Sequence, residues 1–219
     1  MYFPILFEDG EALVIDKPAG LPLDRPRAGG PCLDEKLDQL RFGFQRAPLP
    51  VHRLDQDTSG CLLLARNPKA HKRFAAAFEA REVDKRYLGI VAGSLSADSG
   101  TIELSLSKIS SAEAGWRMIA AKNGKASVTH WRKLAEVGGN TLVEFLPETG
   151  RTHQIRVHAL TGLGLPLLGD PIYGAGSTAQ AGRTMLHAAG LTVRRGKKPP
   201  IIAVSPLPAD FTALGFSDG

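Results

Sequence analysis

Residues 51–60 read Val51-His52-Arg53-Leu54-Asp55-Gln56-Asp57-Thr58-Ser59-Gly60, and the apolar run Cys61-Leu62-Leu63-Leu64-Ala65 follows directly. The two segments predict a strand over 51–55, a polar turn, and a buried strand over 61–65. In an extended 51–55 segment, Arg53 and Asp55 would project from one face and Leu54 from the other. Asp55 would then stand at a strand end, beside a turn whose backbone and hydroxyl groups can hold a carboxylate in place. The alternative is an ordinary Arg–Asp pair on a surface turn, which contributes little to stability.

The chain before and after this stretch predicts further short elements. Strands are expected over 5–8 and 12–16, around the turn Asp9-Gly10. Leu33, Leu37 and Leu40 recur at helical spacing and predict a short amphipathic helix over about 32–42. A longer helix is expected over 69–82, because Pro68 stands where a helix can begin.

From Tyr87 onward the sequence changes to a β pattern. Strands are expected over 87–92, 101–106, 126–131, 141–145 and 154–158, and loops over 93–100, 121–125 and 174–183. Short strands separated by turn residues, with few helices, favour a mixed sheet that is mainly antiparallel. We therefore predict an α/β fold of the α+β kind, a single domain over residues 1–219 with this sheet flanked by helices.

The composition of the 219-residue chain is that of an ordinary globular protein, with 43% hydrophobic and 22% charged residues. A chain of this length can fold without a disulfide or a metal. Cys32 and Cys61 form no CxxC pair, and Cys61 is expected to be a buried thiol in a reducing cytosol. The first residues lack the basic region of a signal peptide, and no run of about 18 apolar residues occurs. The sequence thus predicts a soluble, cytoplasmic protein without a membrane segment.

The basic residues are grouped rather than dispersed. The formal net charge is +5 with a sequence pI near 9.4, and clusters lie at 66–73, 81–86 and 194–198. Such clusters suit a polyanionic partner. On charge alone, a solvated basic surface that binds nothing anionic is an equally good explanation.

A second polar motif reads Thr149-Gly150-Arg151-Thr152-His153-Gln154-Ile155-Arg156-Val157-His158. As a strand it would place Arg156 and His158 on one face. A guanidinium can hold a carboxylate ionised and oriented through two parallel hydrogen bonds, so Arg156 is a physically reasonable partner for Asp55. An ordinary polar strand face is the alternative. The spacing of His153 and His158 does not match a helical zinc pair, and no phosphate-cradling or dinucleotide motif occurs, so no metal site is expected.

A third motif reads Val83-Asp84-Lys85-Arg86-Tyr87. A tyrosine that follows basic residues at the start of a strand can stack on a base while the charges of Lys85 and Arg86 hold phosphates. A half-buried strand tyrosine is the alternative.

Together these segments resemble the RluA family of pseudouridine synthases, over residues from about 6 to about 211. The resemblance rests on separated motifs in the expected order: Leu13-Val14-Ile15-Asp16-Lys17-Pro18-Ala19-Gly20, His52-Arg53-Leu54-Asp55-Gln56-Asp57-Thr58-Ser59-Gly60, Lys85-Arg86-Tyr87, Gly150-Arg151-Thr152-His153-Gln154-Ile155-Arg156 with Leu168-Gly169-Asp170, and Met185-Leu186-His187-Ala188. It implies the pseudouridine synthase fold, with an active cleft across the middle of the sheet. Many relatives carry an N-terminal S4 RNA-binding domain. Here the motifs begin almost at residue 1, so no S4 domain is expected.

The resemblance also implies a role for each matching residue. Asp55 stands at the catalytic aspartate, Tyr87 at the tyrosine that packs on the target base, and Arg156 at the arginine that pairs with the aspartate. Arg53 stands at the arginine that inserts into the RNA stack where the target has been flipped out. The remaining predicted site residues are those that line the pocket, Leu186 or its neighbour Met185, and those that contact RNA beside Arg53, namely His52, Arg151, Lys85 and Arg86.

The implied reaction breaks the N1–C1′ bond of a uridine, turns the base and joins C5 to C1′. No redox change occurs and no group is added, so no cofactor is expected. Asp55 would attack C1′ or abstract the 2′-proton to give a glycal, and the sequence leaves both routes open. The predicted partner is a structured ribosomal or transfer RNA, and the predicted state is a monomer.

Two other functions fit part of the sequence. A catalytically silent RNA-binding protein of the same fold would keep the basic clusters but would have no need of Asp55, Tyr87 and Arg156 together. A carbohydrate-active enzyme could use Asp55 and Asp57 as paired acids. That alternative lacks a sugar-binding platform, because aromatic residues make up only 6% of the chain.

Overall fold

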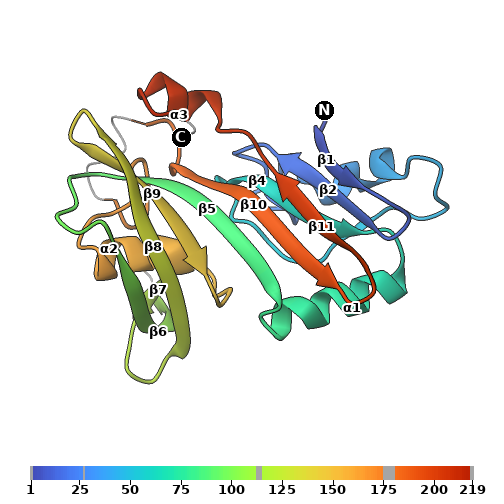
Figure 1. Cartoon of the computed structure of the whole chain (residues 1–219), viewed down its shortest axis with the longest axis horizontal. Helices are drawn as coiled ribbons and strands as arrows, with labels where there is room; N and C mark the ends of the chain where they lie inside the picture. Colours follow the sequence, from blue (N-terminus) through green and yellow to red (C-terminus); the bar gives the residue numbers. More distant parts are fainter. Residues whose placement is uncertain (1, 27, 112–114, 175–180, 218–219) are drawn as a thin grey trace. The chain divides into compact units, whose positions relative to one another are not determined.

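The computed structural model of the chain describes residues 2–26, 28–111, 115–174 and 181–217. The chain forms two compact units (Figure 1). Unit 1 comprises Met1–Lys85 and His187–Pro206, and unit 2 comprises Arg86–Leu186 and Leu207–Gly219. Each unit therefore takes in a segment from late in the chain, and each is described here by itself.

Unit 1 is built on a sheet with strand order β1, β2, β4 and β10. The bounds are β1 (Ile5–Glu8), β2 (Ala12–Lys17), β4 (Ser59–Ala65) and β10 (Leu186–Arg195), with β3 (Leu49–Pro50) paired to β4 and β11 (Lys198–Val204) paired to β10. Most neighbours are antiparallel, whereas β4 and β10 run parallel at Ser59 and Gly60. Gly60 is needed there, because a Cβ at this position would lie 2.2 Å from the carbonyl oxygen of Ala188. Every residue of β4 is buried, as its apolar run predicts.

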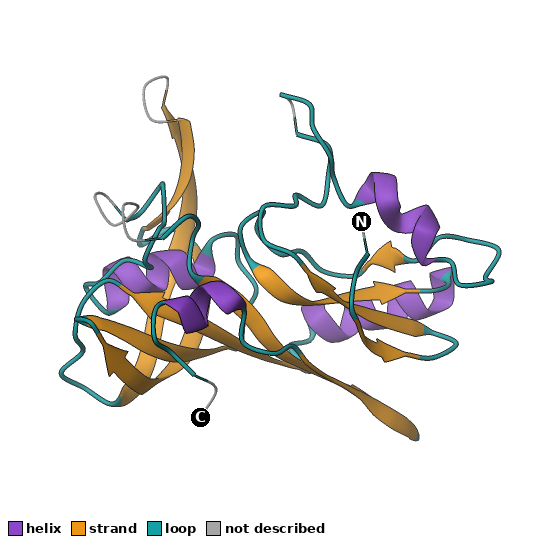
Figure 2. Ribbon diagram, turned by 90° about the horizontal axis from the view of Figure 1, so that it is seen from above, coloured by secondary structure: helices purple, strands orange, loops and turns teal. Residues whose placement is uncertain are grey.

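The helices of unit 1 cover this sheet (Figure 2). The helix α1 (Pro68–Glu79) begins at Asn67, whose side chain accepts a hydrogen bond from the Ala70 N–H, and Pro68 occupies the first turn. Phe74 of α1 is buried against Leu63 and Val193 in the core. The segment η1 (Asp34–Leu40) is a 3-10 helix with its apolar side chains buried. Cys32 and Cys61 are buried free thiols, and burial raises the pKa of Cys61 to about 12.

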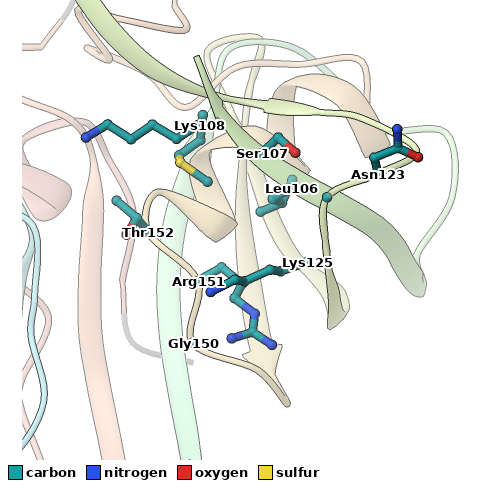
Figure 3. A pocket seen from close by; sticks show the side chains of 10 residues that line it. Leu106, Ser107, Lys108, Asn123, Lys125, Gly150, Arg151 and Thr152 are labelled. Atoms are coloured by element: carbon teal, nitrogen blue, oxygen red, sulfur yellow. The ribbon is translucent and has the colours of Figure 1, made fainter. Parts of the chain in front are cut away.

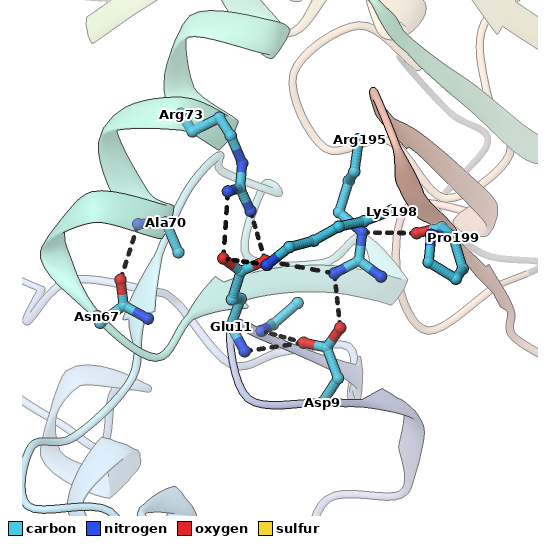
Figure 4. Close-up of polar contacts among 9 residues, drawn as sticks. Asp9, Glu11, Asn67, Ala70, Arg73, Arg195, Lys198 and Pro199 are labelled. Carbon is cyan, nitrogen blue, oxygen red and sulfur yellow. Dashed lines mark hydrogen bonds and ion pairs between the residues drawn. The ribbon is translucent and has the colours of Figure 1, made fainter.

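An ion-pair network ties the β1–β2 turn to α1 and to the β10–β11 hairpin (Figure 4). Arg73 donates two hydrogen bonds to Glu11, and Lys198 lies 2.9 Å from the same carboxylate. Arg195, whose side chain is almost fully buried, pairs with Asp9. In the clusters at 66–73 and 194–198, further pairs join Arg66 to Glu8 and Arg194 to Asp84. Most of the charged residues in the basic clusters at 66–73 and 194–198 thus form ion pairs within the folded chain.

Glu11→Gln is expected to lower the free energy of unfolding by about 1 kcal/mol at neutral pH, because solvent screens the ion pairs of Glu11. The melting temperature should therefore fall by roughly 2–4 °C. The hydrogen bond from Arg73 and then that from Lys198 lower the pKa of Glu11 from 4.5 to about 2. Because the folded pKa lies below the unfolded one, this stabilisation is complete above pH 4.5 and is lost as the pH falls through about 2.

Melting curves recorded from neutral pH down to about pH 3 measure this effect. The wild type should lose its advantage over the variant as the solution is acidified. Glu82→Gln, which removes an exposed carboxylate, serves as the control and should melt like the wild type. A Glu11→Gln protein as stable as the wild type at neutral pH would show that the network does not stabilise the fold.

Unit 2 is built on an antiparallel sheet with strand order β5, β9, β8, β6 and β7. The bounds are β5 (Val83–Val91), whose residues from Arg86 onward belong to this unit, β6 (Ser99–Ser111), β7 (Gly115–Ala120), β8 (Lys125–Val137) and β9 (Asn140–Pro147). The helix α2 (Gln154–Gly162) packs on this sheet, and its Ile155 and Ala159 join Trp131 and Phe145 in the core. The short helix α3 (Ala209–Ala213) lies near the end of the chain.

The predicted fold class is confirmed, since both units combine mainly antiparallel strands with few helices. The helix predicted over 69–82 is confirmed, although it ends at Glu79 and Arg81 has a left-handed φ of 61°. The loop predicted over 174–183 lies partly outside the described residues. None of the helices in the described ranges has the length and hydropathy that crossing a membrane requires.

Two predicted strands are wrong. The strand before the Asp55 turn is β3, which ends at Pro50, and residues 51–58 form a loop in which the Thr58 N–H donates to the Asp55 carbonyl oxygen. The segment 154–158 is the first part of α2. Its β-branched residues Ile155 and Val157 alternate with polar residues, as in a half-buried strand. All residues from Gln154 to Ala159 are buried, however, so the alternation of apolar and polar residues does not distinguish a strand from a helix here.

Candidate active site

Asp55 lies half-buried in the loop 51–58 of unit 1, directly before β4. The neighbouring Leu54 is buried and fixes the loop, whereas Arg53 is exposed. The hydrogen bond from the Thr58 N–H to the Asp55 carbonyl oxygen, at 3.1 Å, closes the turn that follows. Asp55 thus lies beside a polar turn that leads into a buried strand, as the sequence predicted, but without a strand over 51–55.

A buried lysine holds this turn in place. Lys17, at the end of β2, is 0% exposed, and its ammonium group donates to the carbonyl oxygens of Pro18, Leu21 and Gln56 at 2.8, 2.9 and 3.0 Å. The Gly20 N–H donates to the Gln56 oxygen as well. Charge-assisted hydrogen bonds inside a protein are stronger than neutral ones, so Lys17 clamps the loop after β2 onto the residue next to Asp55. The sequence offered a signal for this residue in the motif Asp16-Lys17-Pro18, but no role was predicted for it.

Lys17→Met is expected to lower both the stability of unit 1 and the turnover rate. Methionine fills a similar volume but removes the donor for three carbonyl oxygens, a loss of about 2–3 kcal/mol. If Asp55 has the catalytic role that the resemblance implies, the loosened turn should reduce kcat more than it raises KM, because Asp55 would be less precisely placed. Thermal melting and single-turnover kinetics measure the two effects. Lys69→Met on the exposed face of α1 is the control, and a Lys17 variant that behaves like this control would refute the clamp.

His52 lies in the same loop, where its ring accepts a hydrogen bond from the Leu63 N–H at 3.0 Å and stacks on Phe78 with ring centroids 4.5 Å apart. Burial, assisted by the positive charge of Lys85, lowers the pKa of His52 to about 3. The ring is therefore neutral at physiological pH and fastens the loop to β4 and α1. Its predicted contact with RNA stays a prediction, and a neutral ring could contribute no charge to it.

The predicted base-stacking motif lies on β5. Tyr87 is half-buried, stands opposite Phe145 and packs against the core of unit 2. Arg86 donates to the Glu144 carboxylate at 2.6 Å. Burial, with a contribution from the charge of Arg81, lowers the pKa of Lys85 to about 8. Arg132 donates to the same carboxylate, so Glu144 is shared by two guanidinium groups. The RNA contacts predicted for Lys85 and Arg86 stay predictions.

Arg156 of α2 is held by a carboxylate in unit 2. Its Nε and Nη2 atoms lie 2.7 and 2.8 Å from the two oxygens of Asp170, and the side chains are 8% and 0% exposed. Asp170 also accepts hydrogen bonds from the N–H groups of Ile172 and Tyr173. Burial raises the pKa of Asp170, but Arg156 and these N–H groups outweigh it, so the pKa lies below its usual value. The guanidinium is therefore fixed in orientation, although the sequence assigned no role to Asp170.

The motif residues around Arg156 build the start of α2. Gln154 makes four hydrogen bonds: its amide group donates to the Val128 carbonyl and the Thr129 hydroxyl, and its oxygen accepts from the Thr149 hydroxyl and the Arg151 N–H. His153 begins the helix with a left-handed φ of 52°. This motif fixes α2, and with it Arg156, against β8.

Within unit 2, the predicted pocket residues Met185 and Leu186 are both buried. Leu186 belongs to the core cluster that includes Phe145 and Leu167. Gly89 lies beside it, where a Cβ would meet Leu167 at 2.9 Å and Phe145 at 3.0 Å. The lining of a base pocket by Leu186 stays a prediction.

The predicted site residues fall into two groups. His52, Arg53, Asp55 and Lys85 belong to unit 1, and Tyr87, Arg86, Arg151, Arg156, Met185 and Leu186 belong to unit 2. The pair predicted between Asp55 and Arg156 stays a prediction. In the described ranges, no group of three or more His, Cys, Asp or Glu side chains could hold a metal ion.

Unit 1 thus holds a carboxylate on a turn that Lys17 clamps, and unit 2 holds a guanidinium that a buried carboxylate fixes. The family model described as RNA pseudouridylate synthase matches residues 11–161. The chain belongs to this family, and its members are isomerases of RNA.

Relatives with known names agree with this assignment. An uncharacterised RNA pseudouridine synthase of Zymomonas mobilis is 55% identical over 212 residues, which cover 97% of each chain. The ribosomal large subunit pseudouridine synthase D of Nitrosomonas europaea is 38% identical over 96% of this chain and 63% of its own length. Among solved structures, human RNA pseudouridylate synthase domain containing 1 superposes with a TM-score of 0.77 at 29% identity, covering 94% of this chain and 83% of that one.

Proposed function

We propose that this chain converts uridine in the RNA of the large ribosomal subunit into pseudouridine, with Asp55 as the catalytic carboxylate. Membership of the RNA pseudouridylate synthase family supports the reaction. The relative from Nitrosomonas europaea, whose name specifies the large subunit, supports the choice of RNA. The observation that supports the residue assignment is the turn at Asp55, which Lys17 joins to the loop after β2 through the carbonyl oxygens of Gln56, Pro18 and Leu21.

The reaction requires one carboxylate at the sugar and a slot for the detached base. Asp55 either attacks C1′ or takes the 2′-proton, and in both cases the N1–C1′ bond breaks and the uracil anion leaves. The base turns and C5 bonds to C1′, while the bond from Asp55 to C1′ breaks in the first route, or Asp55 returns the proton to C2′ in the second. The C5 proton is then lost to solvent and N1 takes up a proton. The target must first leave the RNA stack, at a cost of about a few kcal/mol. On this proposal Arg53 refills the gap in the stack.

Two residues of unit 2 complete the proposed mechanism. On this proposal Arg156 keeps the Asp55 carboxylate ionised and aimed, while Asp170 fixes the orientation of the guanidinium. Tyr87 holds the free base by stacking. The two compact units would accordingly act as one catalytic domain, and a single chain would suffice.

A catalytically silent RNA-binding protein of the same fold is the second candidate. In such a protein the clamped turn beside Asp55 and the buried Arg156–Asp170 pair would serve only the stability of the fold. A catalytic assay separates the two candidates directly.

The test is to incubate the purified chain with RNA from cells of its source that lack this gene, and then to map pseudouridine in ribosomal and transfer RNA. We expect new pseudouridine in large-subunit ribosomal RNA, at sites that are modified in cells with the gene. Pseudouridine confined to transfer RNA would refute the proposed substrate. RNA that is bound but never modified would establish the silent alternative.

A further inference from the structure

Unit 2 contains a pocket of about 490 Å³ that none of the predicted catalytic residues lines (Figure 3). Four segments form it: Leu106-Ser107-Lys108 of β6, Met118 of β7, the turn Asn123-Gly124-Lys125 that leads into β8, and Gly150-Arg151-Thr152 before α2. Figure 3 shows Ser107 and Lys108 on one side and Arg151 and Thr152 on the other, with Asn123 at the turn.

All charged side chains that line this pocket are positive. They are Lys108, Lys125 and Arg151, and no carboxylate is among the lining residues. In the described part of the chain none of these three makes an ion pair, whereas Arg73, Arg195 and most other arginines do. Three unbalanced positive charges around one hollow create a potential that attracts an anion.

The walls of the pocket are fixed by the backbone. At Gly124 a Cβ would lie 2.6 Å from backbone atoms of Leu106, so the turn is packed directly onto β6. Arg151 is held through its own N–H, which donates to the Gln154 side chain at 2.9 Å, and its Nε donates to the Ala126 carbonyl oxygen at 3.3 Å. The backbone that carries the three cationic side chains is therefore already in place before an anion binds, which lowers the entropy cost of binding.

The remaining polar groups of the lining match a sugar–phosphate chain. The hydroxyl groups of Ser107 and Thr152 and the amide of Asn123 can hydrogen-bond to ribose hydroxyl and phosphate oxygens. Beside the pocket, the Lys108 ammonium lies 5.0 Å from the ring centroid of Trp116, which is 44% exposed. Trp116 thus provides an optical reporter next to the pocket, because the other tryptophan, Trp131, is buried.

We propose that this pocket binds the backbone of the RNA substrate at nucleotides other than the target, through Lys108, Lys125 and Arg151. The proposal rests on the proposed function for the identity of the anion as RNA. It places RNA contacts on β6, on the start of β8 and before α2, and it assigns them to two lysines that no sequence motif indicated.

The test compares two variants of equal charge. Lys108→Gln, Lys125→Gln and Arg151→Gln together take the formal net charge from +5 to +2, and so does the matched set Lys36→Gln, Arg41→Gln and Arg46→Gln in unit 1, outside the basic clusters. Binding of fluorescein-labelled oligouridylate is followed by fluorescence anisotropy over a range of salt concentrations, and melting curves establish that both variants are folded.

The pocket variant is expected to bind roughly 10- to 100-fold more weakly at low salt, and the slope of log affinity against log salt should fall by about 2, since each lost phosphate contact contributes about 0.7 on a single strand. The matched variant should lose much less. RNA should also quench the fluorescence of the wild type but not that of a Trp116→Phe protein. Equal losses in the two variants, or an unchanged salt slope in the pocket variant, would overturn the proposal.

This outcome is independent of the chemistry. Binding is measured on an Asp55→Asn background as well as on the wild type, so a protein that makes no pseudouridine can still confirm or refute the pocket. Conversely, if the pocket does not bind RNA, the test of pseudouridine formation remains valid.

Discussion

Asp55→Asn is expected to abolish pseudouridine formation while leaving RNA affinity nearly unchanged. Asparagine keeps the shape of the side chain but can neither attack C1′ nor accept the 2′-proton, so the rate should fall by a factor on the order of 10⁴ or more. The backbone hydrogen bond from Thr58 to the carbonyl oxygen of residue 55 would remain, so the turn should keep its conformation. Release of tritium from RNA labelled at C5 of uridine measures the rate, because C5 loses its proton when it bonds to C1′.

The matched control for this variant is Asp57→Asn, which alters the other carboxylate of the same turn. It should keep most of the activity. If both variants were equally inactive, the two carboxylates would act as a pair, as in the carbohydrate-active alternative. Retained activity in Asp55→Asn would remove Asp55 from the mechanism.

Asp170→Asn is expected to have the largest effect on stability. It would remove the charge of a carboxylate that makes two hydrogen bonds to the buried Arg156 guanidinium, and breaking a buried ion pair costs about 3–5 kcal/mol in proteins. For a chain of this size the melting temperature should fall by roughly 10 °C. The pKa of Asp170 in the folded protein lies below its ordinary value of 3.8. Its contribution to stability is therefore complete above that pH and is lost as the pH falls further.

The control for Asp170→Asn is Asp210→Asn. Asp210 also pairs with an arginine of unit 2, Arg183, but its side chain is 44% exposed. Exposed pairs contribute about 0–1 kcal/mol, so this variant should melt close to the wild type. Equal melting temperatures for the two variants would show that the buried pair contributes no more than a surface pair.

Local patterns in the sequence predicted most of the fold. The buried strand β4 follows from an uninterrupted apolar run, and α1 follows from Pro68 and the helical spacing behind it. The antiparallel strands of unit 2 follow from short β-rich segments between turn residues. In each case the signal lies within the element itself, so no knowledge of its neighbours is needed.

The segment at Arg156 could not be predicted in this way. Ile155 and Val157 alternate with polar residues as in a strand, yet Gln154 and His158 are buried too and bond to β8. Burial on all sides removes the alternation of faces on which the distinction between helix and strand depends. What selects the helix is the set of hydrogen bonds that Gln154 makes with residues more than twenty positions away.

The sequence predicted the residue types of the candidate site, but it did not predict the residues that hold them in place. Asp55 and Arg156 stand in motifs that can be read from the sequence, and the exposure of Asp55 on a turn was expected from the residues after it. The Lys17 clamp joins residues 39 positions apart, and the Arg156–Asp170 pair joins residues 14 apart. Such partners are set by tertiary packing, so nothing in the local sequence specifies them.

The most direct test of the proposed mechanism is a crystal structure of the protein bound to substrate RNA in which the target carries fluorine at C5, a substitution that blocks loss of the C5 proton. We expect the target nucleotide outside the RNA stack, with C1′ or the 2′-carbon within about 3.5 Å of an Asp55 carboxylate oxygen. The Arg156 guanidinium should contact the same carboxylate. A target that remains stacked in the RNA, or an Asp55 carboxylate that faces away from its sugar, would contradict the account.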